Sequence, residues 1–249
     1  EGLSLNACAR VLRISENTVI GRERRLAALR PALMLCALMD NFFQMITEGD
    51  EVYTKVGENR APSDSEGRTI ILPDRASRFI WDLRCGEKDR GLFEQAMEIM
   101  CQLIENTDDI SLITDGERRY GNTLFKLCNE LVRDGKPGRP KKTLRKGVKA
   151  RIKNKGSQAH KKGPKRPKYQ TPCPEHPETV QNIENKDIRA NHVEALNSSL
   201  RPRNSAHRRK TDTYAKSSDG GLQRTLDVYW MIHNFVRSHF TTRTVPAVA

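Results

Sequence analysis

The apolar positions recur at helical spacing over much of the chain, and short apolar runs interrupt this pattern in its first half. Residues 3–26 predict two short helices with a turn at Arg13 and Ile14, for which Ser4 and Ser15 are suitable N-caps. The other helices predicted from this periodicity cover residues 32–47, 88–105, 120–132, 185–200 and 221–238.

Four short runs rich in β-branched and apolar residues predict strands at residues 51–56, 69–72, 78–84 and 110–114. The second and third runs are joined through Pro73-Asp74-Arg75, which predicts a hairpin. The order of strand, hairpin, helix, strand and helix predicts an α/β fold in which helices pack on a mixed sheet.

The first two helices look like a helix-turn-helix, in which the second helix enters the major groove with its N-terminal residues at the base edges. We therefore expect residues 1–34 to form a small all-α DNA-binding region and residues 35–249 to form the second domain. A plain helical hairpin remains the alternative. The residues of the second helix expected to contact DNA are Glu16, Asn17, Thr18, Arg22, Arg24 and Arg25.

The chain has 249 residues and a formal net charge of +13, but the positive charge is concentrated in one segment. Residues 133–168 hold 16 Lys or Arg and a single acid, Asp134, which favours contact with a polyanion. Frequent Gly and Pro argue against a long helix, so we expect a flexible basic insertion at 133–169. A solubilising linker is the alternative.

Within this segment, residues 137–142 (PGRPKK) resemble the core of an AT-hook, an extended and cationic segment that suits a narrow A·T minor groove. Arg139, Lys141 and Lys142 are the residues expected to contact DNA there, and general binding to phosphates is the alternative.

Composition excludes some other classes of protein. The longest uncharged apolar run, residues 31–39, is too short to span a bilayer. No basic and then apolar leader is apparent, and the six cysteines are scattered, as is typical of a reduced cytosolic protein. Cys173 and His176 have the spacing of one zinc-ligand pair, but no second pair accompanies them.

Three acids occupy positions that could bring them together. Asp50 lies at the start of the first predicted strand, Asp115 follows the fourth, and Glu194 lies on a helix. In a ribonuclease H-like sheet the first and fourth strands are neighbours, so these acids could meet at one edge. Each also has a simple structural alternative as a turn or surface acid, and Glu51 competes with Asp50 because strand alternation lets only one of them face the site.

Carboxylates gathered in one place repel one another unless a cation holds them. Hard oxygen ligands suit Mg²⁺, for which Mn²⁺ is an expected substitute. Two such ions about 4 Å apart can activate a hydroxyl group and stabilise the leaving oxygen of an in-line displacement at phosphorus. The expected metal ligands and catalytic residues are therefore Asp50, Asp115 and Glu194.

The chain resembles insertion-sequence transposases of the acidic-triad (DDE) class, which are related to retroviral integrases. It is most similar to a small bacterial family that combines a helix-turn-helix with a compact catalytic domain. The matching segments are Gly49–Gly57, Thr114-Asp115-Gly116 with Tyr120, Glu194 with Asn197 and Arg201, and the tail from Asn234. The resemblance implies a ribonuclease H-like mixed sheet with flanking helices, and DNA contacts from Asn197 and Arg201 beside the metal ions. It departs from the family in its long basic segment. Relatives carry a Cys-based zinc module before the helix-turn-helix, and the sequence starts at Glu1, after the place of that module.

The resemblance implies a bacterial, cytoplasmic and nucleoid-associated transposase that cleaves the ends of its element and joins them to target DNA. Its partner would be double-stranded DNA, on which a homodimer or larger oligomer is expected because two ends must be joined. Three alternatives remain: a non-catalytic regulator or inactive element remnant, a structure-specific nuclease of the same fold, and an RNA-binding protein.

Overall fold

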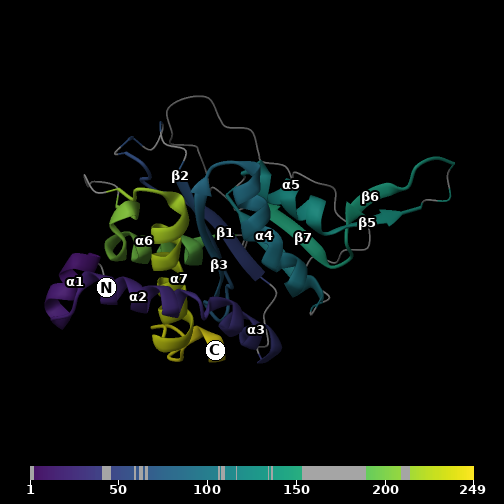
Figure 1. The fold of residues 1–249 in the computed structure, drawn as a ribbon. Helices are drawn as coiled ribbons and strands as arrows, with labels where there is room; N and C mark the ends of the chain where they lie inside the picture. The colour runs from purple at the N-terminus through teal and green to yellow at the C-terminus, as the bar shows by residue number, and fades with distance from the viewer. Residues whose placement is uncertain are drawn as a thin grey trace, which may run out of the picture.

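In the computed structural model, the chain forms a mixed sheet covered by helices on both faces (Figure 1). The structure describes residues 3–40, 46–58, 60–61, 64, 67–105, 107, 110–115, 117–133, 135, 137–152, 189–208 and 214–249. Within these residues, no helix combines the length and the apolar character needed to cross a membrane.

The central sheet has five strands in the order β3-β2-β1-β4-β7. Strand β2 pairs antiparallel with both β1 and β3, whereas β4 pairs parallel with both β1 and β7. This mixed order is compatible with a ribonuclease H-like fold. The strands are β1 (Ile46–Tyr53), β2 (Gly67–Pro73), β3 (Ile80–Glu87), β4 (Ile110–Thr114) and β7 (Val148–Ile152).

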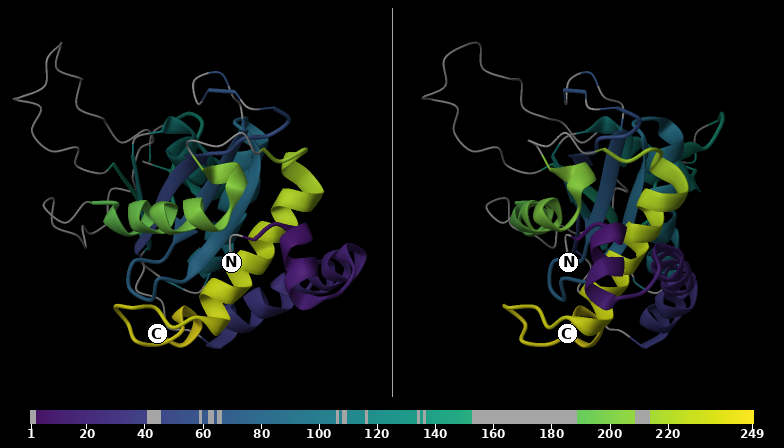
Figure 2. Two further views of the ribbon diagram at one scale, coloured as in Figure 1. Left: turned by 90° about the vertical axis from the view of Figure 1, so that its left-hand side faces the viewer. Right: turned by 60° about the vertical axis from the view of Figure 1, so that its left-hand side comes forward.

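Helices cover both faces of the sheet. α4 (Arg90–Glu105) and α5 (Arg118–Leu127) pack on one face, and α6 (Asn191–Arg203) and α7 (Gln223–Met231) pack on the other (Figures 1 and 2). A Cβ at Gly49 would meet the Tyr120 ring of α5 at 3.3 Å, whereas Asp50 bonds to Asn197 of α6. Successive strand residues point to opposite faces, so α5 and α6 must lie on opposite sides of β1.

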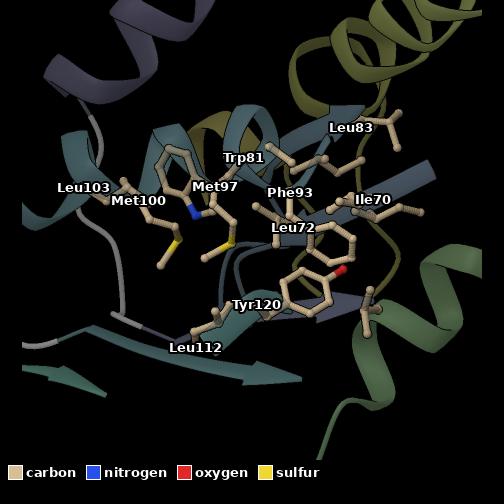
Figure 3. Close-up of a cluster of buried hydrophobic side chains, with 14 of the residues drawn as sticks. Ile70, Leu72, Trp81, Leu83, Phe93, Met97, Met100, Leu103, Leu112 and Tyr120 are labelled. Carbon is tan, nitrogen blue, oxygen red and sulfur yellow. The ribbon is translucent and has the colours of Figure 1, made fainter. Parts of the chain in front are cut away.

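Part of the core lies between α4 and the sheet (Figure 3). The sequence pattern identified this face of α4 correctly, because all seven apolar positions that it selected are buried. These are Leu92, Phe93, Ala96, Met97, Met100, Leu103 and Ile104. Phe93 also packs edge-to-face on Tyr120, with ring centroids 4.9 Å apart, which ties α4 to α5.

The first helices are α1 (Leu5–Leu12), α2 (Glu16–Ala27) and α3 (Arg30–Asp40). Ser4 and Ser15 cap α1 and α2 as predicted, by accepting hydrogen bonds from the backbone N–H groups of Ala7 and Thr18. Arg13 makes the turn between them in the left-handed conformation (φ 53°). The structure thus contains two helices joined by a tight turn.

These helices pack directly on the rest of the chain. α2 lies against α7, where Glu23 accepts a hydrogen bond from Thr225 Oγ1 at 2.7 Å. At the start of α3, the Arg30 guanidinium pairs with both Asp82 of β3 and Asp227 of α7. α3 also spans the expected domain boundary at residues 34 and 35, so the first helices share an interface with the sheet domain.

Several predicted boundaries were wrong. β1 begins at Ile46, although residues up to 47 were expected to be helical, because Thr47 and Glu48 are polar but buried. The predicted helix over 120–132 ends at Leu127, and β5 (Asn129–Val132) follows. Strand β5 pairs with β6 (Lys141–Leu144) in a separate two-stranded sheet.

The basic segment is also more ordered than expected. It supplies β6 and the edge strand β7, which pairs with β4 in parallel from Val148 to Ile152. Lys149 in the middle of this strand is only 1% exposed, so a charged residue occupies a position that the sequence pattern could not identify as core. The prediction of a flexible insertion is therefore wrong for residues 141–144 and 148–152, and residues 153–169 lie outside the described part of the chain.

The remaining predicted helices are present with shifted ends. α6 begins at Asn191, while residues 185–188 of its predicted range lie outside the described residues. The last predicted helix, 221–238, contains α7, with a π-helical turn before it (Ser218–Leu222) and another after it (Ile232–Val236). Trp230 of α7 is fully buried and donates a hydrogen bond to the Ile80 carbonyl of β3.

Candidate metal centre

Strand pairing brings Asp50 and Asp115 together. β1 and β4 are parallel neighbours in which Gly49 lies opposite Thr114, the last residue of β4. Continued by one position, this register sets Asp50 opposite Asp115. The two acids, 65 positions apart in the sequence, therefore lie side by side at the end of β4.

Glu51 joins these two acids. Asp50, Glu51 and Asp115 each offer a carboxylate oxygen, and the three oxygens lie within 4.8 Å of one another. The expectation that only one of Asp50 and Glu51 can face the site was wrong. Asp115 follows the end of β4, so its carboxylate lies at the end of the sheet, where side chains from either face of β1 can approach it.

Helix α6 holds Asp50 in place. The side-chain amide of Asn197 donates a hydrogen bond to Asp50 Oδ2 at 2.8 Å, and the N–H of Glu51 donates one to Asp50 Oδ1 at 3.0 Å. Each carboxylate oxygen thus has at least one donor, which fixes the orientation of the group while leaving lone pairs for a cation.

Lys88 partly neutralises the opposite side of the site. Its Nζ lies 2.8 Å from Glu51 Oε1 and 3.1 Å from Glu117 Oε2. Burial raises the pKa of Glu51, and the charges of Asp115 and Glu117 add to this effect, while Lys88 opposes it. Burial disfavours the charged form of Lys88, but its pairing with Glu51 and Glu117 outweighs that effect and raises its pKa. The acids therefore outnumber the cation beside them.

Three polar atoms around the carboxylates are buried and have no hydrogen-bond partner among the described residues: Glu51 Oε2, Tyr120 Oη and Asn197 Oδ1. Burial raises the pKa of Tyr120 well above its usual value, as do the charges of Glu51, Asp50 and Asp115. Leaving buried polar atoms unpaired costs about 1–3 kcal/mol each, so they indicate a site whose polar groups await a ligand. Oxygen donors of this kind fit Mg²⁺ or Mn²⁺.

Glu194 is placed differently from the other two predicted acids. It lies in the first turn of α6, is exposed, and does not belong to the cluster of Asp50, Glu51 and Asp115. It precedes Asn197 by three residues, so both lie on the same side of α6. Arg201, four residues after Asn197, lies on that side too and is half-buried. The predicted residues Glu194, Asn197 and Arg201 thus line the flank of α6 that Asp50 contacts.

Sequence reasoning missed the residue that anchors α6. Glu48, two positions before Asp50 on β1, is fully buried and accepts hydrogen bonds from the backbone N–H groups of His192 and Val193 at 3.0 and 2.9 Å. Its other oxygen accepts from Arg75 Nε at 2.9 Å and lies 2.8 Å from His192 Nδ1. The N-cap residue of α6, Ala190, makes no side-chain hydrogen bond, so Glu48 caps the N-terminus of this helix instead. No local sequence signal identifies it, because 144 positions separate it from His192.

The residues predicted to contact DNA from α2 lie at the surface. All six side chains are exposed, while Glu23 of the same helix accepts a hydrogen bond from Thr225 of α7. These six are Glu16, Asn17, Thr18, Arg22, Arg24 and Arg25. None of these six side chains belongs to the core, and their contact with DNA remains a prediction.

Arg139, Lys141 and Lys142 are also exposed. Lys141 and Lys142 begin β6, opposite Val132 and Leu131 of β5, and Arg139 lies in the connecting turn. The β5–β6 hairpin extends away from the body of the molecule (Figure 1). The AT-hook-like residues thus lie near the tip of a projecting hairpin instead of in an extended linker.

Comparisons with known proteins give limited information. No protein-family model matches the chain, and no curated protein matches it. Among solved structures, the chain is similar to one described as the crystal structure of the Mos1 mariner paired end complex with Mn, at 14% sequence identity and a TM-score of 0.22. The match covers 50% of this chain, and the chain spans about half (52%) of the matched one. So low a score assigns neither a fold nor a family.

Proposed function

We propose that the chain is a DNA transposase of the acidic-triad class, which cleaves the ends of its element and transfers them to target DNA. The observation that carries this proposal is the pairing of Asp50 with Asp115 at the end of β4, beside α6 and its Glu194. Adjacent acids on the two central parallel strands, with another acid on a covering helix, form a ligand set for divalent cations bound to a phosphodiester.

In this proposal, Asp50 and Asp115 hold the metal ions, and Glu194 completes the ligand set when DNA is bound. When bound, Mg²⁺ or Mn²⁺ lowers the pKa of a ligated water and stabilises the leaving oxygen. Asn197 orients the Asp50 carboxylate, and Lys88 limits the repulsion between Glu51 and Glu117. Arg201, on the same side of α6, is suited to hold a DNA phosphate.

The DNA-binding surfaces in this proposal are the exposed side of α2 and the basic β5–β6 hairpin. α2 would place its first turn at base edges in the major groove of an element end. The hairpin would contact the phosphate backbone or the minor groove through Arg139, Lys141 and Lys142. Joining two ends to one target requires a dimer or larger assembly on DNA.

Cleavage and strand transfer test the proposal directly. The full chain is incubated with labelled DNA from the two flanks of its coding region, together with plasmid target DNA and either Mg²⁺ or Mn²⁺. We expect metal-dependent nicking at the element ends and covalent end-to-target products. Asp115→Asn should abolish both while leaving DNA binding intact, and Glu105→Gln, which changes an exposed acid at the end of α4, should leave both unchanged.

The assay also separates the alternatives. End binding without any cleavage by the unmodified chain would support a non-catalytic regulator and would overturn the proposal. Cleavage without joined products would identify a nuclease of the same fold. Tighter binding to RNA than to duplex DNA over a range of salt concentrations would favour the RNA-binding alternative.

A further inference from the structure

A second candidate site lies on the other flank of α6, where the helix faces the C-terminal segment (Figure 2). A cavity of about 380 Å³ opens there, within the usual size range of small-ligand sites. His192, Ala195, Leu196 and Ser199 of α6 form one wall, and residues 237–241 form another. None of the predicted catalytic residues lines it.

The position of this cavity relative to the acids follows from helix geometry. At about 100° per residue, His192, Ala195 and Ser199 lie roughly half a turn of the helix away from Glu194 and Asn197. The metal centre and the cavity therefore occupy opposite flanks of α6. A helix is about 10–12 Å wide with its side chains, so the path over it from one flank to the other is roughly 16–19 Å, which a DNA strand covers in about five nucleotides at ~3.4 Å each. A strand cleaved at the acids can thus reach the cavity.

The lining of the cavity is strongly basic. It contains three arginines, Arg78, Arg203 and Arg237, and among the described residues no Asp or Glu lines it. Of the acids that act on Arg78, Glu48 already binds Arg75 and His192, and Asp74 accepts hydrogen bonds from Ala76 and Ser77. Burial lowers the pKa of Arg78, and the charge of Arg75 lowers it further, against the opposing effect of Glu48 and Asp74. Such a lining favours an anionic group inside the cavity.

Two histidines that line the cavity, His233 and His239, have lowered pKa values. Burial lowers the pKa of His239, and the nearby Arg78 and His192 lower it further. His233 Nε2 donates a hydrogen bond to the Arg78 carbonyl, 2.9 Å away, and burial lowers the pKa of His233 to about 4, so the ring is neutral at pH 7. The positive charge of the lining therefore comes from Arg78, Arg203 and Arg237, and it is these side chains that favour an anion.

The remaining lining combines the hydroxyl side chains of Ser199, Ser238 and Thr241 with an apolar part that includes an exposed aromatic ring. Pro73, Ala195 and Leu196 form an apolar wall, and Phe240 stands at the rim with 80% of its surface exposed. Arg243 lies over the Phe240 ring, 4.6 Å from its centroid. An aromatic ring beside arginines is the combination on which nucleic-acid bases stack while their phosphates are held.

From these observations we propose that the cavity binds one unpaired nucleotide of the DNA strand that passes over α6. Its phosphate lies among Arg78, Arg203 and Arg237, and its base stacks on Phe240 against the apolar wall. This proposal rests on the proposed function in taking DNA as the ligand. It adds a preference for DNA with an unpaired nucleotide near the cleaved position, which the metal centre alone does not provide.

Binding measured without divalent metal ions tests the cavity independently of catalysis. Fluorescence anisotropy in EDTA compares the full chain on a blunt duplex and on the same duplex with an unpaired 3′ extension. We expect the extended duplex to bind about five- to tenfold more tightly, as is typical of one base stacked on an aromatic ring. Phe240→Ala should reduce this ratio to nearly one, and Phe240→Trp should preserve it.

Tyr214→Ala provides the matched control, because Tyr214 is another exposed aromatic residue (45% exposed) that does not line the cavity. Unchanged thermal unfolding of the variants would confirm that they are folded. Equal binding to both duplexes, or a Phe240→Ala variant that still discriminates between them, would overturn the nucleotide site alone. A chain that binds neither duplex would overturn the DNA ligand, and with it the proposed function.

Discussion

The side-chain amide of Asn197 lies 2.8 Å from Oδ2 of Asp50, and this hydrogen bond joins two segments that are 147 positions apart in the sequence. Asn197 is only 4% exposed, and its Oδ1 has no partner among the described residues. A neutral donor at this position orients the carboxylate without cancelling its charge, as a Lys or Arg would. The hydrogen bond therefore fixes the orientation of the Asp50 carboxylate within the acidic cluster.

Changing Asn197 to Asp tests this arrangement. Asn197→Asp places a second carboxylate within about 3 Å of Asp50, where two negative charges repel strongly. In EDTA we expect the melting temperature to fall by several degrees, which corresponds to about 1–2 kcal/mol. Millimolar Mn²⁺ should restore most of the loss. Thermal unfolding with and without metal measures both effects, and an equal loss under the two conditions would show that no ion binds beside Asp50.

Glu51 and Glu194 compete for the role of third metal ligand, and matched substitutions separate them. As a proposed metal ligand, Glu194 should be needed for cleavage, so we expect Glu194→Gln to reduce cleavage at least 100-fold. Because Glu194 is exposed, the same change should have little effect on stability. Glu51→Gln breaks a partly buried ion pair with Lys88, so it should lower the unfolding free energy by about 1 kcal/mol and reduce cleavage less. Cleavage rates and thermal unfolding of both variants measure this. The reverse pattern would assign the third ligand to Glu51.

The basic hairpin should contribute to DNA affinity through charge alone. Substituting Arg139, Lys141 and Lys142 together with Ala removes three exposed cations and no buried contact. The slope of log affinity against log salt concentration should fall by about one for each cation that contacts a phosphate. Titrations at several salt concentrations measure the slope. Arg90→Ala, which removes an exposed cation on α4, should leave it unchanged, and a triple variant with the original slope would exclude the hairpin from the interface.

Buried histidines should make stability depend on pH. His207 Nε2 lies 2.8 Å from Thr69 Oγ1, and burial together with the charge of Arg201 lowers its pKa to about 3. The unfolded chain binds this proton near pH 6.5, so the stabilising effect of neutral His207 is complete above that pH and is lost as the pH falls toward 3. The loss amounts to about 1.4 kcal/mol per pH unit. His207→Gln should make the denaturation free energy less steeply dependent on pH between 6.5 and 4, and an unchanged slope would contradict the prediction.

Much of the sheet domain could be predicted from sequence because its core residues are apolar and regularly spaced. Helix α4 and strand β4 were predicted closely for this reason, and Asp115 was placed correctly after β4. Strand β7 could not be predicted, because Lys149 and Arg151 give it the composition of the basic segment around it. Its position depends on pairing with β4, which no local pattern encodes.

The candidate site was predictable only in part, for a similar reason. Asp50 and Asp115 follow from strand order, but the contacts that shape the site are long-range. Lys88 reaches Glu51 from 37 positions away, and Asn197 reaches Asp50 from the far side of the basic segment. Such contacts form only when the sheet and α6 have packed, so they cannot be predicted from the periodicity or spacing of residues in the sequence.

The attachment of α6 to Glu48 also has a consequence for biosynthesis. The Glu48 carboxylate of β1 caps the first turn of this helix. The α6 segment alone therefore lacks the group that accepts hydrogen bonds from its first backbone N–H groups. During translation the sheet strands emerge long before α6, and the helix can dock only once its own residues have left the ribosome. A partly synthesised chain would thus contain Asp50 and Asp115 without the helix that orients them, so the proposed cleavage activity would arise only when synthesis is nearly complete.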